Sequence, residues 1–250
     1  MTAPHSFNLS RFVTFAAGLV LAGLLAGCAS TSSTPWDAAS VRPNTTTQWQ
    51  HHSFPGKTSN QFAYSTLDGR TAMGVQSSAS ASMLRKVVNV EPDQFDALRF
   101  SWKVPALITD ADLALRDKDD SPVRLVLSFD GDRSKLSSRD RALSELARAL
   151  TGEEMPYATL MYVWCNQREP GSVVLNPRTD RIRKLVLESG PEKLNRWLDY
   201  ERDIRADYRQ AFGEEPGRLI AIGIMTDTDN TKSSAQAWYG PVVLGLAAIR

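Results

Sequence analysis

The sequence has few of the residues that build metal and nucleophilic centres. It has two cysteines and three histidines among 250 residues, and neither a Cys-x-x-Cys pair nor a His-Glu-x-x-His motif. Zinc chemistry is therefore poorly supported, because zinc sites draw on those side chains at such spacings. A Gly-x-Ser-x-Gly motif is also missing, and with few imidazoles to act as base, serine hydrolysis is disfavoured.

The chain also lacks an excess of either charge. It has 29 Lys and Arg residues against 28 Asp and Glu residues, which gives a formal net charge of +1. The basic residues are spread among acidic ones, whereas binding to nucleic-acid phosphates needs a clustered basic surface. The composition argues against a nucleic-acid partner.

One long apolar run is present, near the N-terminus, and it ends at Leu25-Ala26-Gly27-Cys28. This ending resembles the lipobox of bacterial lipoproteins. Arg11 supplies a positive n-region and Phe12 to Leu25 an apolar h-region, which is the layout of a secretory signal. The run is shorter than the ~20 apolar residues of a spanning helix. We expect residues 1–27 to be a lipoprotein signal peptide, the alternatives being an ordinary signal peptide or an uncleaved N-terminal helix.

Cleavage before Cys28 would give that cysteine acyl chains such as palmitate, which anchor the protein to a lipid bilayer. Ala29 follows the cysteine, and in lipoproteins of the enterobacterial type the lack of Asp at this position accompanies sorting to the outer membrane. The predicted location is the cell envelope, on the periplasmic face of the outer membrane. Cys165 would then be the one remaining thiol, so that no intrachain disulfide forms. We interpret it as a buried thiol.

The remainder divides by composition into a linker and one folded part. Residues 28–53 are rich in Ser, Thr, Pro and Asn and predict a flexible tether. Residues 54–250 predict a single domain, with enough chain for a sizeable core.

Alternation of apolar and polar residues dominates that domain. Leu98, Phe100 and Trp102 fall on one side of an extended segment and Arg99 and Ser101 on the other, the period of two typical of a half-buried strand. Asp68-Gly69 between two such segments is a hairpin signal. The strands that we expect are 61–66, 71–77, 84–90, 98–104, 123–129, 157–164, 172–175, 182–187, 219–225 and 235–246.

Two segments have helical spacing instead. Ser138 to Leu150 has leucines one helical turn apart, and Glu192 to Phe212 has an apolar stripe that ends at Gly213, a natural C-cap. Many strands with two helical insertions predict a mainly β fold, a β-sandwich of jelly-roll type.

An ordered set of short motifs runs through the domain, each weak alone. They are Phe100-Ser101-Trp102-Lys103-Val104, Asp119-Asp120 ahead of Arg124, Tyr162-Val163-Trp164, Thr226 to Thr231, and Trp238-Tyr239-Gly240. In this order they resemble the bacterial family called domain of unknown function 3047. The resemblance implies a sandwich similar to galactose-binding-like domains and carbohydrate-binding modules. It implies no activity.

Acidic residues gather at the ends of two predicted strands, before 123–129 and after 219–225. If these strand ends are neighbours, the side chains meet on one rim and offer the oxygen ligands that Ca²⁺ takes. The leading reading of these acids is that they are turn and cap residues, with calcium ligation second and a catalytic acid pair for glycoside hydrolysis third. Calcium is the one cofactor that the sequence suggests, with Asp117, Asp119, Asp227, Asp229 and Asn230 as ligands.

Carbohydrate sites combine aromatic rings, which stack on sugars, with polar groups that bond the hydroxyls. Core packing is the favoured reading for Trp164, because it shares a face with apolar strand residues, and a structural ion pair is favoured for Arg124. The candidate ligand-binding residues are Asp119, Asp120, Arg124, Trp164, Asn166, Trp238 and Tyr239.

The sequence therefore predicts a lipid-anchored envelope protein whose β-sandwich binds a ligand, with a polysaccharide or cell-wall glycan as the leading candidate. A glycan hydrolase with paired carboxylates and a non-catalytic scaffold for other envelope proteins are the alternatives. The reading leans away from an enzyme.

Overall fold

The computed structural model describes residues 33–40 and 48–246. The chain divides into two units, residues 1–32 and residues 33–250, and the second unit is described here. The predicted signal peptide and Cys28 lie outside the described residues. Within the described part, no helix is long and apolar enough to cross a membrane.

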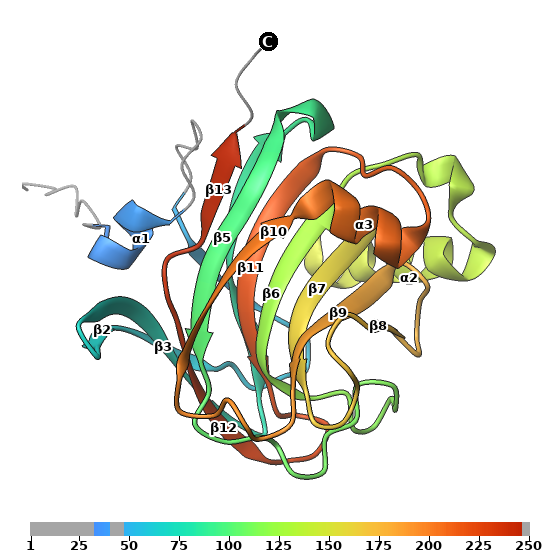
Figure 1. The fold of residues 1–250 in the computed structure, drawn as a ribbon. Coiled ribbons are helices and arrows are strands. Elements are labelled where there is room, and N and C mark those ends of the chain that lie inside the picture. The colour runs from blue at the N-terminus through green and yellow to red at the C-terminus, as the bar shows by residue number, and fades with distance from the viewer. Residues whose placement is uncertain (1–32, 41–47, 247–250) are drawn as a thin grey trace, which may run out of the picture. The chain divides into compact units, whose positions relative to one another are not determined.

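The described strands form two sheets (Figure 1). The larger sheet has seven strands in the order β1-β4-β11-β6-β7-β9-β8. Its pairs are antiparallel except β7 with β9, which is parallel. Its strands are β1 (Gln50–Ser53), β4 (Ala81–Val90), β11 (Leu219–Asp227), β6 (Ser121–Phe129), β7 (Ala158–Cys165), β9 (Ile182–Ser189) and β8 (Val173–Leu175).

The smaller sheet has six described strands, five of them in the order β10-β5-β12-β3-β2, and β13 also pairs with β5. Its strands are β10 (Trp197–Asp203), β5 (Phe95–Lys103), β12 (Ser234–Tyr239), β3 (Arg70–Ser78), β2 (Gln61–Leu67) and β13 (Val243–Leu246). The described helices are α1 (Pro35–Ala39), α2 (Ser138–Thr151) and α3 (Ile204–Phe212), with 3₁₀ turns η1 (Pro92–Gln94) and η2 (Arg133–Lys135).

The core lies between the two sheets, because alternate residues of each strand point to the same face. Phe100 of β5 stacks on Tyr162 of β7 across the sheets, with ring centroids 5.7 Å apart. Leu125 and Leu127 of β6 are fully buried in the same cluster. The predicted mainly β, jelly-roll-type sandwich is therefore confirmed.

The hairpin signal at Asp68-Gly69 is also confirmed. Both residues have positive φ, 53° and 73°, and the register pairs Leu67 with Arg70. A two-residue turn with two positive φ angles matches the right-handed twist of the strands it joins.

The helix expected over Ser138 to Leu150 is present as α2, but the one expected over Glu192 to Phe212 is only partly present. Its second half is α3, whereas Trp197–Asp203 is the strand β10, paired with β5. In this segment the half-buried side chains of Leu198, Tyr200 and Arg202 alternate with exposed acidic residues, as in a strand. Pairing with an open edge of the smaller sheet decides the conformation.

The expected tether is a second correction. Residues 35–39 form α1, and Trp36 is fully buried in the core, where its indole N–H donates to the carbonyl of Tyr239 at 2.9 Å. Residues 50–53 form β1, an edge strand of the larger sheet. The described parts of residues 28–53 therefore belong to the folded unit, and the packing of Trp36 is what holds them there.

A charged groove on the outer face of the larger sheet

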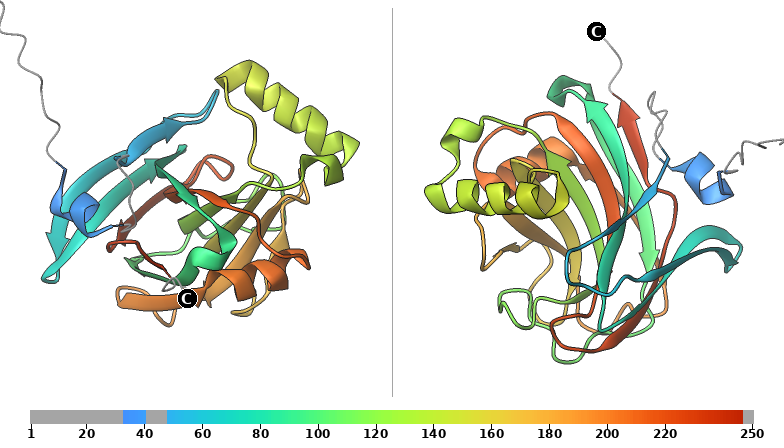
Figure 2. Two further views of the ribbon diagram at one scale, coloured as in Figure 1. Left: turned by 90° about the horizontal axis from the view of Figure 1, so that it is seen from above. Right: turned by 180° about the vertical axis from the view of Figure 1, so that it is seen from behind.

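The outer face of the larger sheet, opposite the core, carries a groove of about 540 Å³. Alternation along the strands points Met83 of β4, Val126 of β6 and Met161 of β7 into it, while their neighbours enter the core. Helix α2 forms one wall. In the view from above, α2 and α3 lie on opposite sides of the larger sheet (Figure 2, left). A groove of this volume suits a small ligand or a few sugar units.

Helix α2 presents its leucines to the groove instead of to the core. Leu146 and Leu150 are 56% and 65% exposed, whereas the buried residues of α2 are Asp140 and Ser144. Asp140 accepts a hydrogen bond from the hydroxyl of Thr179 at 2.5 Å. The helix is thus attached by polar contacts, and its apolar face remains open to the groove.

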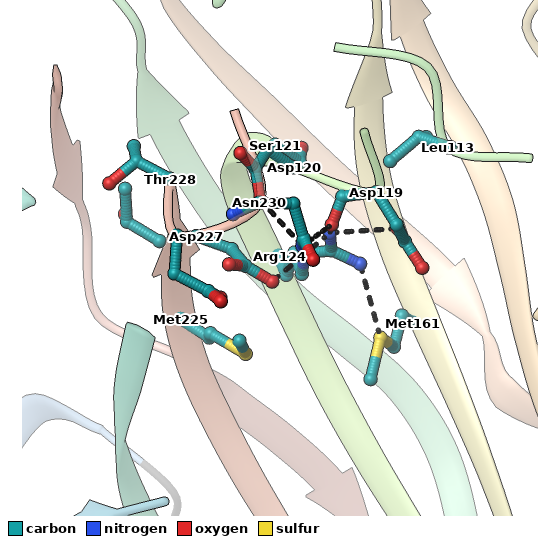
Figure 3. Close-up of polar contacts among 12 residues, drawn as sticks. Leu113, Asp119, Asp120, Ser121, Arg124, Met161, Met225, Asp227, Thr228 and Asn230 are labelled. Carbon is teal, nitrogen blue, oxygen red and sulfur yellow. Dashed lines mark hydrogen bonds and ion pairs between the residues drawn. The ribbon is translucent and has the colours of Figure 1, made fainter. Parts of the chain in front are cut away.

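The opposite end of the groove is polar and is centred on Arg124 of β6 (Figure 3). The side chain of Arg124 is 3% exposed, and its guanidinium lies 3.0 Å from a carboxylate oxygen of Asp119 and 3.4 Å from one of Asp227. It also donates to the main-chain carbonyl of Asp119 at 2.7 Å. The ends of β6 and β11 therefore do meet on one rim, as the acidic residues predicted.

Lys184 of β9 completes this cluster from the other side. It is fully buried, and its ammonium group donates to Asp119 at 2.5 Å and to the carbonyl of Leu113 at 2.7 Å. Burial, helped by the nearby positive charge of Arg124, lowers the pKa of Lys184 to about 8. Asp119 is shared between two buried cations, which fixes its position.

Asp227 is the carboxyl group with the most perturbed ionisation in the groove. Burial raises its pKa well above the ordinary value, and the neighbouring Asp229 and Asp120 raise it further against the opposing effect of Arg124. Among the described residues, Oδ1 of Asp227 and Nε of Arg124 are buried and make no hydrogen bond. One acceptor and one donor are therefore left unsatisfied at the polar end, an arrangement that costs stability unless a ligand or water bonds to them.

Asp120 has a different task, since it holds the loop between β11 and β12. Its buried carboxylate accepts hydrogen bonds from the main chain and side chain of both Asn230 and Thr231, at 2.6 to 3.2 Å. Burial alone would raise the pKa of Asp120, but these hydrogen bonds outweigh it and the pKa is lowered. Asp120 and Asn230 therefore act here as loop-fixing residues.

The expected calcium ligands do not form an open cation site. Oxygens of Asp120, Asp227 and Asp229 lie within 4.8 Å of one another. However, Asp120 is committed to the loop, Asp229 forms an ion pair with Lys57, and Asp227 faces Arg124. Apart from Oδ1 of Asp227, these carboxylates therefore already have protein partners, whereas Ca²⁺ takes six to eight oxygen ligands. Asp117 is exposed and lies outside this group.

The aromatic and amide candidates do not reach the groove. Trp164 and Tyr239 are each 1% exposed in the core, and Trp238 lies against Gly74 of β3 on the smaller sheet, where an added Cβ would be 3.3 Å from the indole. The amide of Asn166 donates to the carbonyls of Ile108 and Ala111. Core packing accounts for Trp164 and Tyr239 and loop bracing for Asn166, whereas Trp238 is half-buried on the outer face of the smaller sheet, away from the groove.

Tyr239 nevertheless stabilises the site from the core side of the larger sheet. Its hydroxyl donates to the carbonyl of Met225 at 2.5 Å and accepts from the main-chain N–H of Arg124 at 3.2 Å. It thereby joins β12 of the smaller sheet to the two strands that bear Arg124 and Asp227.

Sequence reasoning missed Lys57, Arg116 and Arg178, which line the groove, and Lys184, which contacts Asp119 at its polar end. A signal existed for Lys184, because it alternates with Ile182 and Val186 on one face of its strand, where a buried charge needs a partner. No local pattern indicated the other three, because each lies in a loop that only the sheet topology brings to the rim.

Solved structures similar to this chain include a carbohydrate-binding module and a xyloglucanase domain, each at very low identity. The family 11 carbohydrate-binding module of the cellulosomal cellulase Lic26A-Cel5E of Clostridium thermocellum is 9% identical over 81% of this chain and 89% of its own, with a TM-score of 0.39. The xyloglucanase domain of NopAA, a type three effector from Sinorhizobium fredii in complex with cellobiose, is 9% identical over 80% and 94%, with a TM-score of 0.43. Among curated proteins, none matches the chain.

The family profile described as protein of unknown function (DUF3047) matches residues 47–243. This range covers both sheets apart from the end of β13, and it includes every motif on which the resemblance was noted. The chain therefore belongs to the DUF3047 family.

Proposed function

We propose that this domain binds a carbohydrate in the groove, as a lipid-anchored protein of the cell envelope. The observation that carries the proposal is that two atoms at the polar end, Nε of Arg124 and Oδ1 of Asp227, make no hydrogen bond, although their residues form an ion pair through other atoms. A sugar hydroxyl both donates and accepts a hydrogen bond. Hydroxyls of a bound sugar can therefore satisfy both atoms.

The rest of the groove suits the apolar side of a sugar ring. Met161, Met225 and Val126 line its floor next to the charged cluster, and Leu146 lines its wall. Methionine adapts its shape to irregular surfaces. The described lining thus offers hydrogen bonds at its polar end and C–H contact along the rest. The tryptophans and the tyrosine expected from the sequence do not line it, and Phe54 is an aromatic residue that does.

Thermal unfolding of the chain from Ala29 to Arg250, which keeps Trp36, tests the binding step against a panel of envelope and plant polysaccharides. A ligand at ~100 times its Kd should add about 2.7 kcal/mol to the free energy of unfolding. Asp227→Asn, which keeps the shape of the side chain, should reduce the affinity about tenfold or more, because it replaces an acceptor that faces the ligand. Asp199→Asn, an exposed acid on the smaller sheet, is the matched control and should bind like the parent. If no glycan shifts the transition, or if both variants bind equally, the proposal fails.

The lipid anchor rests on the Leu25-Ala26-Gly27-Cys28 motif. In the producing bacterium, the full-length protein should fractionate with the outer membrane and yield an acylated N-terminal peptide by mass spectrometry. Cys28→Ser should release it from the membrane fraction. Recovery of that variant in the membrane, or a mature N-terminus other than Cys28, would contradict acylation.

Hydrolysis of the bound glycan is a second candidate, favoured by one observation. Asp227 has a pKa well above its ordinary value and lies beside a second carboxyl group, that of Asp229, and glycosidases use a pair of carboxyl groups of which one has a raised pKa. Release of reducing ends from a bound polysaccharide would establish it. Asp227→Asn should then lower the rate by about 10³ or more, and binding without product would leave the domain a binding module.

A further inference from the structure

The polar end of the groove continues into a second depression, of about 540 Å³, at the mouth of the site. Arg116 and Arg178 line both cavities, so the two are continuous. The charged side chains of the depression are four cations, Lys57, Arg116, Arg178 and Lys232, and two acids, Asp117 and Asp229.

Most of this positive charge is uncompensated. Lys57 forms an ion pair with Asp229. Across the described chain, Arg116, Arg178 and Lys232 take part in no ion pair, whereas other exposed cations, such as Arg70 and Arg99, do. All three are exposed. They therefore present charge to whatever occupies the mouth.

The loop that bears Lys232 is fixed before any ligand arrives. Lys232 has a φ of 57°, a left-handed conformation that is uncommon for a residue other than glycine. The loop holds it there through the hydrogen bonds of Asp120 to Asn230 and Thr231 and through Ser233 N–H to the carbonyl of Thr228. Strained backbone that its surroundings enforce is found preferentially at functional sites. A fixed backbone also lowers the entropy lost when the lysine binds.

We propose that the ligand of the groove is an acidic glycan, whose anionic groups bind Arg116, Arg178 and Lys232 while its uncharged rings lie along the sheet. This inference rests on the proposed carbohydrate binding and specifies its substrate class. Arginine suits the role because its planar fork makes paired hydrogen bonds to carboxylate or phosphate oxygens. The two sources of anionic oxygen, a uronate carboxylate and a phosphate ester, share this chemistry.

The test compares acidic oligosaccharides with neutral forms of the same backbone by isothermal titration at low ionic strength. The probes are oligogalacturonate and oligoalginate beside their carboxyl-reduced forms, and a phosphorylated mannan oligomer beside its dephosphorylated form. At least one acidic probe should bind about tenfold more tightly than its neutral counterpart, which corresponds to two or three exposed charge pairs. The arm that shows the preference identifies carboxylate or phosphate. Raising the salt concentration should reduce the preference, because exposed pairs are screened.

The triple variant Arg116→Gln, Arg178→Gln, Lys232→Gln should lose the preference and keep the affinity for the neutral form, which shows that the variant is folded. Arg196→Gln, which removes one exposed cation far from the groove lining, is the control and should behave like the parent. Equal binding of acidic and neutral forms, or a preference that survives in the triple variant, would overturn the acidic-glycan inference while carbohydrate binding stands. Binding of no glycan in any arm would remove both.

Discussion

Arg124 is held from several directions, and this explains how an arginine can occupy a central strand. Asp119 and Asp227 face its guanidinium, and the hydroxyl of Tyr239 accepts a hydrogen bond from its main-chain N–H. Burying a charge costs several kcal/mol unless partners surround it. The arrangement therefore adds little stability, and its value lies in fixing donors and acceptors at one place on the sheet.

The raised pKa of Asp227 predicts a pH-dependent stability that a substitution removes. The native carboxyl keeps its proton to a higher pH than the same group in the unfolded chain. The native state is therefore destabilised by this group as pH rises above about 4, until the native pKa is passed. The amide in Asp227→Asn does not titrate, so the variant does not lose stability in this way. The Tm of the variant, relative to that of the parent, should rise between pH 4 and pH 8 in differential scanning calorimetry.

The exposed Asp93 provides the control for that series. Asp93→Asn should keep a constant Tm difference from the parent across the same pH range. A constant difference for Asp227→Asn as well would contradict the raised pKa.

Asp120 predicts the opposite pH behaviour and a large loss on substitution. Asp120→Ala leaves the N–H and O–H donors of Asn230 and Thr231 without their acceptor, which should cost about 2–4 kcal/mol of unfolding free energy. Because the native pKa is lowered, the contribution of Asp120 is present above about pH 4 and is lost as pH falls through the native value. Urea denaturation at pH 7 and at pH 3 measures both effects.

Asp117→Ala is the matched control, because this neighbouring aspartate is exposed. It should change the unfolding free energy by no more than about 0.5 kcal/mol. A loss for Asp120→Ala as small as that would mean that the loop does not depend on this carboxylate.

The partners of the acidic residues predict indifference to calcium. Ca²⁺ would have to displace Lys57 from Asp229 and compete with Arg124 for Asp227. The Tm should therefore stay the same, within about 1 °C, in chelator and in millimolar calcium. A bound ion at ~100 times its Kd would add about 2.7 kcal/mol, or several degrees for a domain of this size. A shift of that size would restore the calcium hypothesis.

At the scale of single elements, α1 shows how a short helix in a polar stretch can matter to the whole domain. Thr34 caps it in a capping box with Asp37, Pro35 lies in the first turn, and Trp36 enters the core beside Trp49, with ring centroids 4.8 Å apart. Five residues make no stable helix alone. Packing of the indole is what orders α1, although it precedes the part of the chain that matches the family.

Trp36→Ala should therefore destabilise the domain by about 3–5 kcal/mol, as for other buried aromatic residues. The midpoint of urea denaturation measures this. Leu175→Ala, at a leucine that is 55% exposed on β8, should leave the midpoint nearly unchanged. A midpoint for Trp36→Ala equal to that of the parent would mean that α1 contributes nothing to stability.

The sequence predicted most of the strands because their alternation is long and regular, as in 98–104 and 123–129. It was misled at 192–212, where apolar residues satisfy helical and strand periods in turn and only the edge of β5 decides between them. The candidate site shows the same contrast between local patterns, which the sequence reveals, and contacts between distant segments, which it does not. Asp119, Arg124 and Asp227 were found through strand ends, while Lys184 and the loop arginines depend on which strands become neighbours. Core packing, the favoured reading of Trp164, is confirmed, whereas Tyr239 was misplaced because alternation along its strand does not reveal which face is the core.

For the molecule as a whole, the order of the larger sheet creates the groove. β11 lies between β4 and β6, and this places the loop after β11 against the loop before β6. The residues that line the polar end of the groove and its mouth come from strands and loops distributed from Lys57 to Lys232. No short fragment of the chain therefore contains this candidate site. The helical insertion α2 adds a wall to a face that a plain sandwich would leave open.

The hold of Asp120 on the loop after β11 has a kinetic consequence. Its hydrogen bonds join residues 110 and 111 positions apart in the chain. Contacts of such sequence separation carry a large loop-closure entropy, and folds that depend on them form in milliseconds to seconds. The polar end of the groove therefore takes shape only when β11 has inserted between its neighbours. If the groove binds a glycan as proposed, a nascent or partly folded chain lacks the site for it, because the two loops that form the polar end have not yet met.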